Sequence, residues 1–433
     1  MTGSQTDPAS GFPAEGLRIA VVGGGVAGIV ASWLLQHSHH VTLFEANDYL
    51  GGHTHTVVIQ EGSDAGTPVD TGFIVLNDRT YPLFRSFLSN LRVDTRETQM
   101  SFSFHDQVRD LTYSGSGLNG LFAQRINLLR PSFWRMLRGV MRFFREAKRD
   151  LERGTVPEVS VGQYLAGRYP RETIEDHLIP MASAIWSAIP GQIQQFPAET
   201  FLRFFDNHGL LGIRDRPRWM TVAGGSHTYV KAFENSFKGR IRLNTPVTVI
   251  SRRNGAVFLQ TRPGERLEFD RVVVATHADD ALKLLADPSD EEVRLLGAWR
   301  YQDNVTVLHT DTSVLPPIQR AWACWNYCRE RSAEEVHPVS VSYSMNLLQG
   351  LSTEQHYCVS LNRSNPVRED AVIAQMVYRH PVYNFDSVKA QGELTSINGQ
   401  RGTWFCGSYF GYGFHEDAVR SAVQVGKAFG VTL

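Results

Sequence analysis

The chain has 433 residues, of which 42% are hydrophobic, 20% charged and 11% aromatic. This is globular composition, which excludes a wholly disordered, collagen-like or coiled-coil protein and allows two or three domains. Forty-three basic and 44 acidic residues leave a formal charge of -1, so the whole protein has no field that would attract nucleic acid or an anionic surface.

The cysteines predict a reducing compartment and argue against a zinc site or a disulfide framework. They are four in number, and none forms a CxxC pair: Cys324, Cys328, Cys358 and Cys406. Cys324-xxx-Cys328 lies among aromatic residues and is interpreted as core packing. We therefore expect a cytoplasmic protein.

The first elements predict a nucleotide-binding fold. Residues 1–16 lack the basic and apolar stretches of a signal peptide and are expected to form a mobile tail. The charge-free run 19–35 is short for a membrane span and is interrupted by glycines, so it is better explained by a strand, a turn and a helix. With the alternating strand 41–46 it forms a β-turn-α-β unit of the doubly wound kind.

A glycine motif occupies the turn of this unit. Gly23-x-Gly25-x-x-Gly28 follows an apolar strand and opens a helix, the context in which this pattern binds a dinucleotide. Gly23 permits the tight turn, Gly25 lets a pyrophosphate approach, and Gly28 lets helix and strand pack closely. Glu45, at the end of the next strand, is expected to accept hydrogen bonds from the ribose hydroxyls and to repel a 2′-phosphate.

Two later stretches show a similar arrangement of glycines, strands and helices. A helix is expected from about residue 225, a strand at 241–250, and a buried strand entering a loop at 269–282. Residues 403–430 read as a strand, a loop of glycines and aromatics, and an amphipathic helix. The organisation expected is α/β: a doubly wound, Rossmann-like domain assembled from 17–100, 221–290 and 392–433, and a split α+β substrate domain from 101–220 and 291–391.

Residues 125–153 hold nine basic side chains against three acids, spaced as a basic amphipathic helix around 133–149. Its apolar residues are Leu137, Val140, Met141, Phe144 and Leu151, and its arginines are Arg135, Arg138, Arg142, Arg145 and Arg149. Two interpretations stay open. The helix packs on its own domain with a solvated charged face, or it faces an anionic membrane, giving peripheral association with the inner membrane face.

Further motifs give a family resemblance. Gly51-Gly52-His53-Thr54 follows Glu45, then comes 69–73, VDTGF, then the mid-chain glycines and the terminal glycine loop. In this order the chain resembles the flavin amine oxidase superfamily, which includes phytoene desaturase and protoporphyrinogen oxidase. GGHTHT, VDTGFIVLN, FFDNHGLL and TWFCGSYFGYGFHED look closer still to bacterial FAD oxidoreductases associated with cyclopropane and methyl-branched fatty acid formation.

The resemblance implies FAD and a set of residues around it. Gly51, Gly52 and His53 would lie beside the pyrophosphate, Val247 would pair its backbone with the adenine, and Asp70 would lie near the isoalloxazine. The complete expected set is Gly23, Gly25, Ala27, Gly28, Glu45, Ala46, Gly51, Gly52, His53, Thr54, Gly72, Phe73, Val247, Gly407, Ser408, Glu416 and Ala418. The helix beginning near Glu416 would direct its positive end toward the flavin pyrimidine.

The chain also departs from the family pattern. His53 replaces the usual arginine after the glycine pair, and Tyr409 replaces the acid that usually holds the ribityl chain. No lysine occurs between Lys283 and Lys389, where amine oxidases place one near flavin N5, which weakens amine oxidation. The segment 380–394 lacks the cysteine that anchors FAD in some relatives, so noncovalent FAD is expected.

Three side chains are candidates for a proton donor or for the pocket wall beside the flavin, with simple packing as the alternative: Tyr409, Tyr412 and His415. His53-x-His55 is interpreted as cofactor contact or structure, and no metal is expected.

The resemblance implies an FAD-dependent oxidoreductase that removes a hydride from a lipophilic substrate, expected to be a fatty acyl chain, free or within a phospholipid. The alternatives are a flavin amine oxidase, a flavin-dependent fatty acid double-bond isomerase and, outside enzymes, a lipid-carrying escort protein of the same fold. No nucleic-acid partner is expected, and the oligomeric state stays open.

Overall fold

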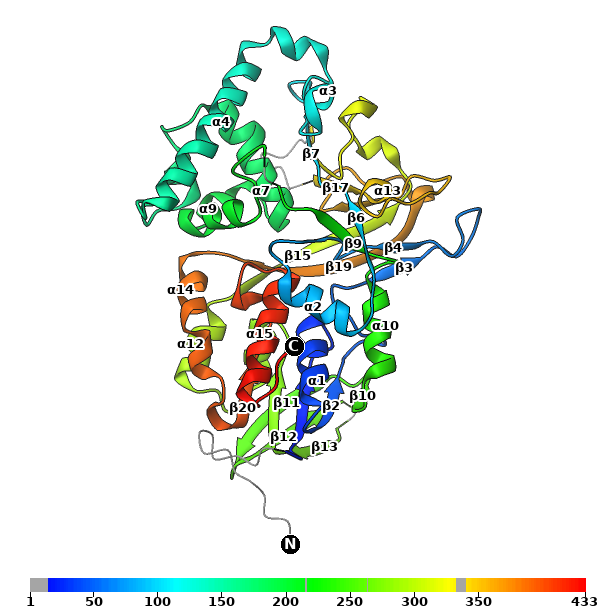
Figure 1. The fold of residues 1–433 in the computed structure, drawn as a ribbon, viewed down its shortest axis with the longest axis vertical. Coiled ribbons are helices and arrows are strands. Elements are labelled where there is room, and N and C mark those ends of the chain that lie inside the picture. The colour runs from blue at the N-terminus through cyan, green and yellow to red at the C-terminus, as the bar shows by residue number, and fades with distance from the viewer. Residues whose placement is uncertain (1–14, 215, 263, 332–339) are drawn as a thin grey trace.

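The structure is a computed structural model that describes residues 15–214, 216–262, 264–331 and 340–433. Almost all of the expected tail at 1–16 lies outside these residues. Figure 1 shows two halves: a parallel sheet with its covering helices at the bottom, and a large mixed sheet with a group of helices above it.

The lower half contains a five-stranded parallel sheet in the order β10-β2-β1-β14-β20. Its strands come from three distant stretches of the chain: β1 (Arg18–Val22), β2 (His40–Phe44), β10 (Arg240–Arg242), β14 (Arg271–Val274) and β20 (Thr403–Phe405). The doubly wound α/β class is confirmed.

Two hydrophobic cores cover the faces of this sheet, because alternate residues of β1 point to opposite sides. Ile19 and Val21 pack with α1 (Val26–Leu35), α10 (His227–Ser236) and α15 (His415–Ala428). Ala20 and Val22 pack with the other core. That core includes the antiparallel sheet of β11 (Val247–Arg253), β12 (Ala256–Thr261) and β13 (Arg266–Phe269), and helices α11 (Ala278–Leu284), α12 (Asp290–Gly297) and α14 (Phe385–Glu393).

The single strand expected at 241–250 is wrong. The run divides into β10 and β11, which belong to different sheets. Asn244 between them has a positive φ of 49°, and Pro246 has no amide hydrogen, so the backbone turns there instead of continuing one ladder.

The upper half contains a seven-stranded sheet in the order β19-β15-β18-β17-β16-β7-β8. Only β16 and β7 pair in parallel. The strands are β7 (Phe102–Asp106), β8 (Leu111–Ser114), β15 (Arg300–His309), β16 (Trp325–Arg329), β17 (Ser340–Ser344), β18 (Cys358–Leu361) and β19 (Val372–Val382).

Two small sheets and the remaining helices complete the molecule. The strands are β3 (Thr56–Val58), β4 (Pro68–Asp70), β5 (Leu76–Asn77), β6 (Thr95–Thr98) and β9 (Trp219–Val222). The helices are α2 (Pro82–Asn90), α3 (Gly117–Leu121), α4 (Pro131–Glu152), α5 (Val161–Leu165), α6 (Arg171–Thr173), α7 (Ile179–Trp186), α8 (Pro190–Gln195), α9 (Ala198–Asn207) and α13 (Met345–Leu348).

Helix α4 confirms the helix expected around 133–149 and shows which side packs. Phe143 and Ala147 are buried against the helical group, whereas Phe133 and Met136 are buried against residues of β7, β8, β16 and β17 in the mixed sheet. Figure 1 places α3 and the start of α4 at the end of the molecule farthest from the parallel sheet. Among the described residues, no helix combines the length and apolar character that a bilayer crossing requires.

Candidate functional site

A cavity of about 1740 Å³ lies between the two halves and collects most of the residues expected to bind FAD. Its lower wall includes the β1–α1 loop, the end of β2 and the start of α15, and its upper wall includes α4, α7 and α9.

The β1–α1 loop is shaped by its glycines. Gly23 has a φ of +104°, and a Cβ on Gly28 would lie 1.8 Å from the Gly23 carbonyl oxygen, so only glycine lets the helix pack onto this turn. Nothing lies within 4 Å of the place where a Cβ of Gly25 would stand, and Gly25 lines the cavity. The backbone is therefore open to a ligand at this point.

The first turn of α1 has no acidic residue and no side-chain cap. Its leading amides have no partner within the helix, and Val26 and Ala27 line the cavity. Free amides and the positive helix end suit a pyrophosphate.

Glu45 lies beside this loop and is 8% exposed. Its Oε2 accepts a hydrogen bond from the Gly24 amide at 2.7 Å, and its Oε1 accepts one from the Asn47 amide at 2.9 Å. Each carboxylate oxygen keeps a further lone pair, so Glu45 can also accept from ribose hydroxyls.

The loop after Glu45 packs against the glycine loop. The Gly51 amide donates to the Gly24 carbonyl at 2.8 Å, and a Cβ on Gly52 would approach the Gly25 Cα to 3.2 Å. Further along, a Cβ on Gly72 would lie 2.1 Å from the His53 carbonyl oxygen, to which the Phe73 amide donates. Glycine at 72 therefore brings Phe73 to the cavity wall.

The C-terminal segment forms the third side of this wall, through Gly407, Ser408 and Ala418. Asp417 Oδ2 accepts the amides of Tyr412 and Phe414 at 3.0 and 3.1 Å, which holds the entry to α15.

Three residues of the expected FAD set lie behind the wall rather than on it: Gly28, Thr54 and Glu416. Glu416 accepts the backbone amides of Leu83 and Phe84, and so caps the start of α2. Asp70 is also set back and accepts hydrogen bonds from Thr56 and Ser226. Burial raises the pKa of Asp70 to about 6.

The three candidate catalytic side chains all line the cavity. Thr54 Oγ1 lies 2.9 Å from His415 Nε2, and the His415 ring stacks on Phe73 with centroids 3.6 Å apart. Burial lowers the pKa of His415 to about 3, so the ring is neutral at physiological pH. Burial raises the pKa of Tyr409 and of Tyr412 above the ordinary phenol value, which favours the neutral hydroxyl form of both.

The upper arm of the cavity is apolar. Leu137, Val140, Met141 and Phe144 of α4 face it, so most of the apolar stripe seen in the sequence forms the cavity wall. Its other apolar lining residues include Leu118, Leu121, Met181, Ile185 and Ile213. An apolar helix stripe has the same sequence pattern whether it contacts a core, a membrane or a cavity. The sequence alone therefore could not decide what the apolar stripe of α4 contacts.

Several histidines of the cavity wall were not predicted from the sequence. His53 lies within 6 Å, between ring centroids, of both His277 and His380. Burial lowers the pKa of His53 well below its ordinary value, and the neighbouring histidines lower it further. His277 and His380 lie on distant elements outside any motif, so only the fold brings them together.

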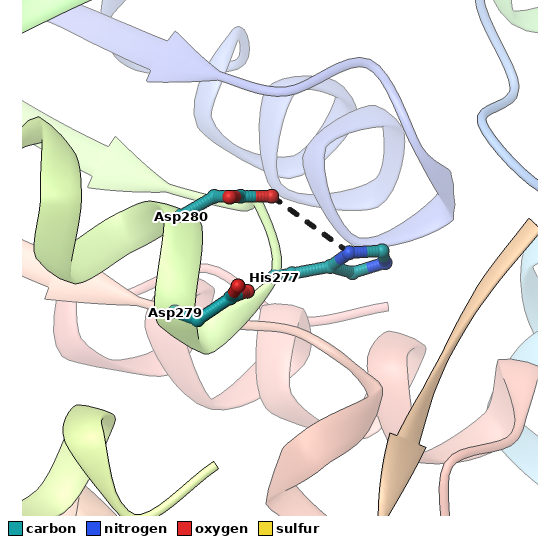
Figure 2. Close-up of side chains that lie close together, drawn as sticks. All are labelled: His277, Asp279 and Asp280. Carbon is teal, nitrogen blue, oxygen red and sulfur yellow. Dashed lines mark ion pairs between the residues drawn. The ribbon is translucent and has the colours of Figure 1, made fainter. Parts of the chain in front are cut away.

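His277 also lies near two acids, Asp279 and Asp280 (Figure 2). Its Nδ1 is 3.9 Å from Asp280 Oδ2. Both acids pair with Arg379 and with Lys283 at 2.5 to 3.0 Å, so two cations already balance their charge. We assign this cluster as an ion-pair network rather than a metal site.

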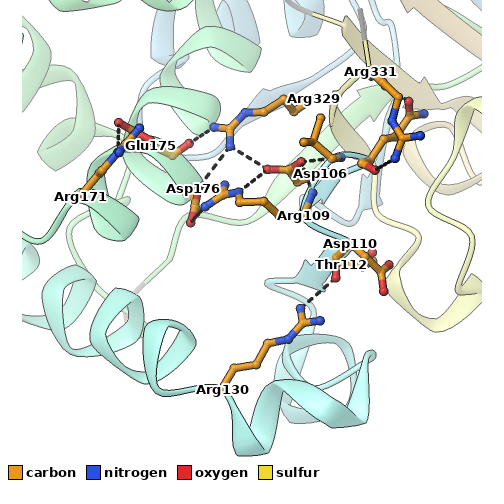
Figure 3. Close-up of polar contacts among 12 residues, drawn as sticks. Asp106, Arg109, Asp110, Thr112, Arg130, Arg171, Glu175, Asp176, Arg329 and Arg331 are labelled. Carbon is orange, nitrogen blue, oxygen red and sulfur yellow. Dashed lines mark hydrogen bonds and ion pairs between the residues drawn. The ribbon is translucent and has the colours of Figure 1, made fainter.

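A second ionic cluster, drawn in Figure 3, joins the mixed sheet to the helical group. Asp106, at the end of β7, binds Arg109 and Arg329, both at 2.8 Å. Both arginines also contact Asp176, which belongs to the π-helical turn Ile174–Leu178. Burial raises the pKa of Asp106, but hydrogen bonds from Arg109 and the charge of Arg329 outweigh it and hold that pKa below its usual value.

The residues present fit an FAD. An open glycine loop, free amides at the α1 N-terminus and a carboxylate at the end of β2 lie along one continuous cavity. Their chemistry matches the pyrophosphate and ribose of a dinucleotide.

Comparison with known proteins agrees with this geometry. Residues 26–357 match the family of flavin containing amine oxidoreductases. An L-amino-acid oxidase of Siganus canaliculatus is 23% identical over 314 residues, which cover 68% of this chain and 57% of that protein. The chain thus spans less than two thirds of the length of that relative.

Two solved structures share the fold. A CLA-producing fatty acid isomerase from P. acnes gives a TM-score of 0.62 at 16% identity, covering 95% of this chain and 98% of the other. A wild-type putrescine oxidase bound to putrescine gives 0.69 at 14% identity, covering 95% and 98%. Because the family match extends over most of the sequence, the chain belongs to the flavin containing amine oxidoreductases.

Proposed function

We propose that the protein oxidises a lipophilic substrate, a fatty acyl chain, with noncovalently bound FAD. The observation that carries the proposal is the apolar upper arm of the cavity, formed by α4, α7 and the residues around Leu118. An acyl chain would bury its methylenes there, at roughly 0.8 kcal/mol for each buried CH₂. The motif resemblance to FAD oxidoreductases of cyclopropane and methyl-branched fatty acid formation supports the same substrate class.

Bound flavin supplies a ring that accepts a hydride. The chain itself orients the substrate and excludes water: the apolar wall fixes the acyl chain, and neutral Tyr409, Tyr412 and His415 face the region between the halves. In this proposal the amides of α1 and the carboxylate of Glu45 hold the dinucleotide part.

Amine oxidation is the second candidate, favoured by the L-amino-acid oxidase relative. An ammonium group would need an available carboxylate. The carboxylates lining the described cavity are Glu45, Glu97 and Asp280. Glu45 lies at the expected ribose position, Asp280 is paired with two cations, and Glu97 is exposed, so we favour the acyl substrate.

We also propose that the protein reaches its substrate at an anionic membrane surface through a tip patch, defined as Leu118, Ile126, Leu128, Leu129 and Trp134. Leu118 is 76% and Leu129 78% exposed, and the Trp134 indole donates to the Leu128 carbonyl at 3.0 Å. Exposed Arg125 and Arg138 lie in the same segments. Leu118 also lines the cavity, so the patch is continuous with the apolar arm.

Lipid mass spectrometry of cells with and without the protein tests the substrate class, followed by incubation of the purified flavoprotein with the affected lipid. A product lighter by two hydrogens supports acyl oxidation. A product of unchanged mass with a moved double bond identifies the isomerase alternative. Unchanged lipids together with peroxide release from amines would assign the protein to the amine oxidases.

A further inference from the structure

Hydrogen bonds at the edge of the cavity fix which nitrogen of His380 carries a proton. The first series of hydrogen bonds begins at the backbone amide of Val305, which donates to Asn362 Oδ1 at 2.9 Å. A backbone amide can only donate, so this contact identifies the oxygen of the Asn362 side chain. Asn362 Nδ2 then donates to Asn304 Oδ1 at 2.5 Å.

A second series of hydrogen bonds independently identifies the same oxygen of Asn304 as an acceptor. Gln302 Nε2 donates to the Ser187 carbonyl oxygen and to Asn304 Oδ1, both at 2.9 Å. A carbonyl can only accept, so this contact identifies the nitrogen of Gln302. Both series of hydrogen bonds therefore end on Asn304 Oδ1, which accepts a hydrogen from each. The Asn304 side chain has no exposed surface.

Asn304 must then present its amide nitrogen to His380. Asn304 Nδ2 lies 2.7 Å from His380 Nδ1. Because Nδ2 has only hydrogens to offer, Nδ1 is the acceptor, and the single hydrogen of the neutral ring is on Nε2.

The surroundings of His380 keep the ring neutral. Burial, helped by His277, lowers its pKa to about 4. The ring stacks on His53 and lines the cavity, with Asn304 and Gln302 of the paired strand β15 behind it. Within the described parts of the chain, no hydrogen bond uses its Nε2.

We propose that His380 Nε2 donates a hydrogen bond to an acceptor atom of the molecule bound in the cavity, either a ring nitrogen or carbonyl oxygen of the flavin or a carbonyl oxygen of the substrate. Asn304 is the positioning residue, because it holds the ring in the donating tautomer. Only the substrate alternative rests on the proposed acyl function.

Nitrogen NMR of histidine-labelled protein tests the tautomer without any substrate. The His380 signals are identified by their loss in His380→Phe. We expect an unprotonated Nδ1 and a protonated Nε2. Asn304→Asp replaces the donor by an acceptor, so Nδ1 should gain a proton, whereas Asn90→Asp at an exposed position should leave the spectrum unchanged. A protonated Nδ1 in the wild type would overturn the proposal.

Titrations with FAD and with oleate then identify the acceptor. If it belongs to the flavin, His380→Phe should weaken FAD binding about tenfold and shift the flavin absorption spectrum, and His380→Gln, which keeps an N–H donor, should restore much of both. If it belongs to the substrate, FAD binding should stay unchanged while oleate binds the FAD-loaded variant about tenfold more weakly.

Unchanged FAD affinity and flavin spectrum, with no loss of oleate affinity, would overturn the donor role. Failure of oleate to bind the wild-type flavoprotein would instead contradict the acyl substrate and leave the flavin titration decisive. Thermal unfolding of each variant without flavin shows whether the substitution has damaged the fold.

Discussion

Glu45, at the end of β2, accepts hydrogen bonds from the amides of Gly24 and Asn47 and also faces the cavity. Glu45→Arg removes the acceptor and places a longer, positively charged side chain at the expected ribose position. We expect FAD affinity to fall more than tenfold, measured as flavin absorbance per protein after titration.

Glu61→Arg makes the same charge change at an exposed position and should retain full flavin. Full occupancy in Glu45→Arg would show that the ribose site lies elsewhere.

Cysteine placement predicts how the flavin is held. All four cysteines are buried and free, and none lines the cavity. Burial raises the pKa of Cys406, the one next to Gly407, to about 12, so it is an unreactive thiol. We expect a yellow protein whose FAD appears in the supernatant after acid precipitation. Flavin retained in the protein pellet would demonstrate a covalent link.

At the scale of elements, α4 presents three different surfaces. One side packs against the helical group and the mixed sheet, the apolar stripe lines the cavity, and exposed arginines occupy the rest. Arg135 and Arg142 pair with Glu172 and Glu146, whereas Arg138 and Arg145 form no ion pair with any described residue. Arg138 and Arg145 are therefore available to anionic lipid, and Arg142 still exposes 51% of its side chain beside Glu146.

Changing Arg138, Arg142 and Arg145 to Gln should reduce cosedimentation with anionic vesicles, since each basic residue near such a surface contributes on the order of 1 kcal/mol. Salt should weaken wild-type binding in the same way. Arg203→Gln, which removes an exposed arginine of α9, is the matched control. Equal binding of the triple variant and the wild type, with FAD content intact, would exclude this face as a lipid contact.

The cluster of Asp106, Arg109, Asp176 and Arg329 links β7, β16 and the π-helical turn. Asp176→Asn removes one of two buried carboxylates that balance two arginines, and we expect the free energy of unfolding to fall by about 3 kcal/mol in urea titrations. The neighbouring Glu175→Gln breaks an exposed pair with Arg171 and should cost less than about 1 kcal/mol. Equal losses in both variants would refute a buried ionic link.

At the scale of the whole molecule, buried histidines predict acid sensitivity. Burial lowers the pKa of His177, His208, His309 and His380 to about 4, against an ordinary value of 6.5. As pH falls below 6.5, the unfolded chain takes up protons that the folded chain does not bind, so stability is present above 6.5 and is lost toward pH 4. Each such site lowers the free energy of unfolding by about 2 kcal/mol by pH 5.

His309 provides a test of this pH dependence. It lies in β15, where its Nε2 is 2.8 Å from Ser360 Oγ. His309→Gln should reduce the loss of stability between pH 7 and pH 5 in urea titrations. His40→Gln at an exposed position should leave that loss unchanged. A pH-independent free energy of unfolding in the wild type would contradict the prediction.

Local pattern explains what the sequence could predict. The β1–α1 unit is visible because its alternation, glycines and helix period lie within thirty residues of one another. The break between β10 and β11 was missed because the apolar pattern runs across it, although Asn244 and Pro246 carried the turn signal. His380 could not be found, because its role depends on Asn304 in β15 and on Asn362, which directly follows β18.

The order of the chain has a consequence for how the protein is made. β20 and α15, which complete the parallel sheet and the cavity wall, are synthesised after the entire mixed sheet. Until they emerge from the ribosome, β14 has an open edge and the apolar face of α1 lacks one of its helical partners. An unpaired edge beside exposed apolar surface is prone to aggregate. We therefore expect nascent chains to depend on chaperones and to retain flavin only after β20 and α15 have docked.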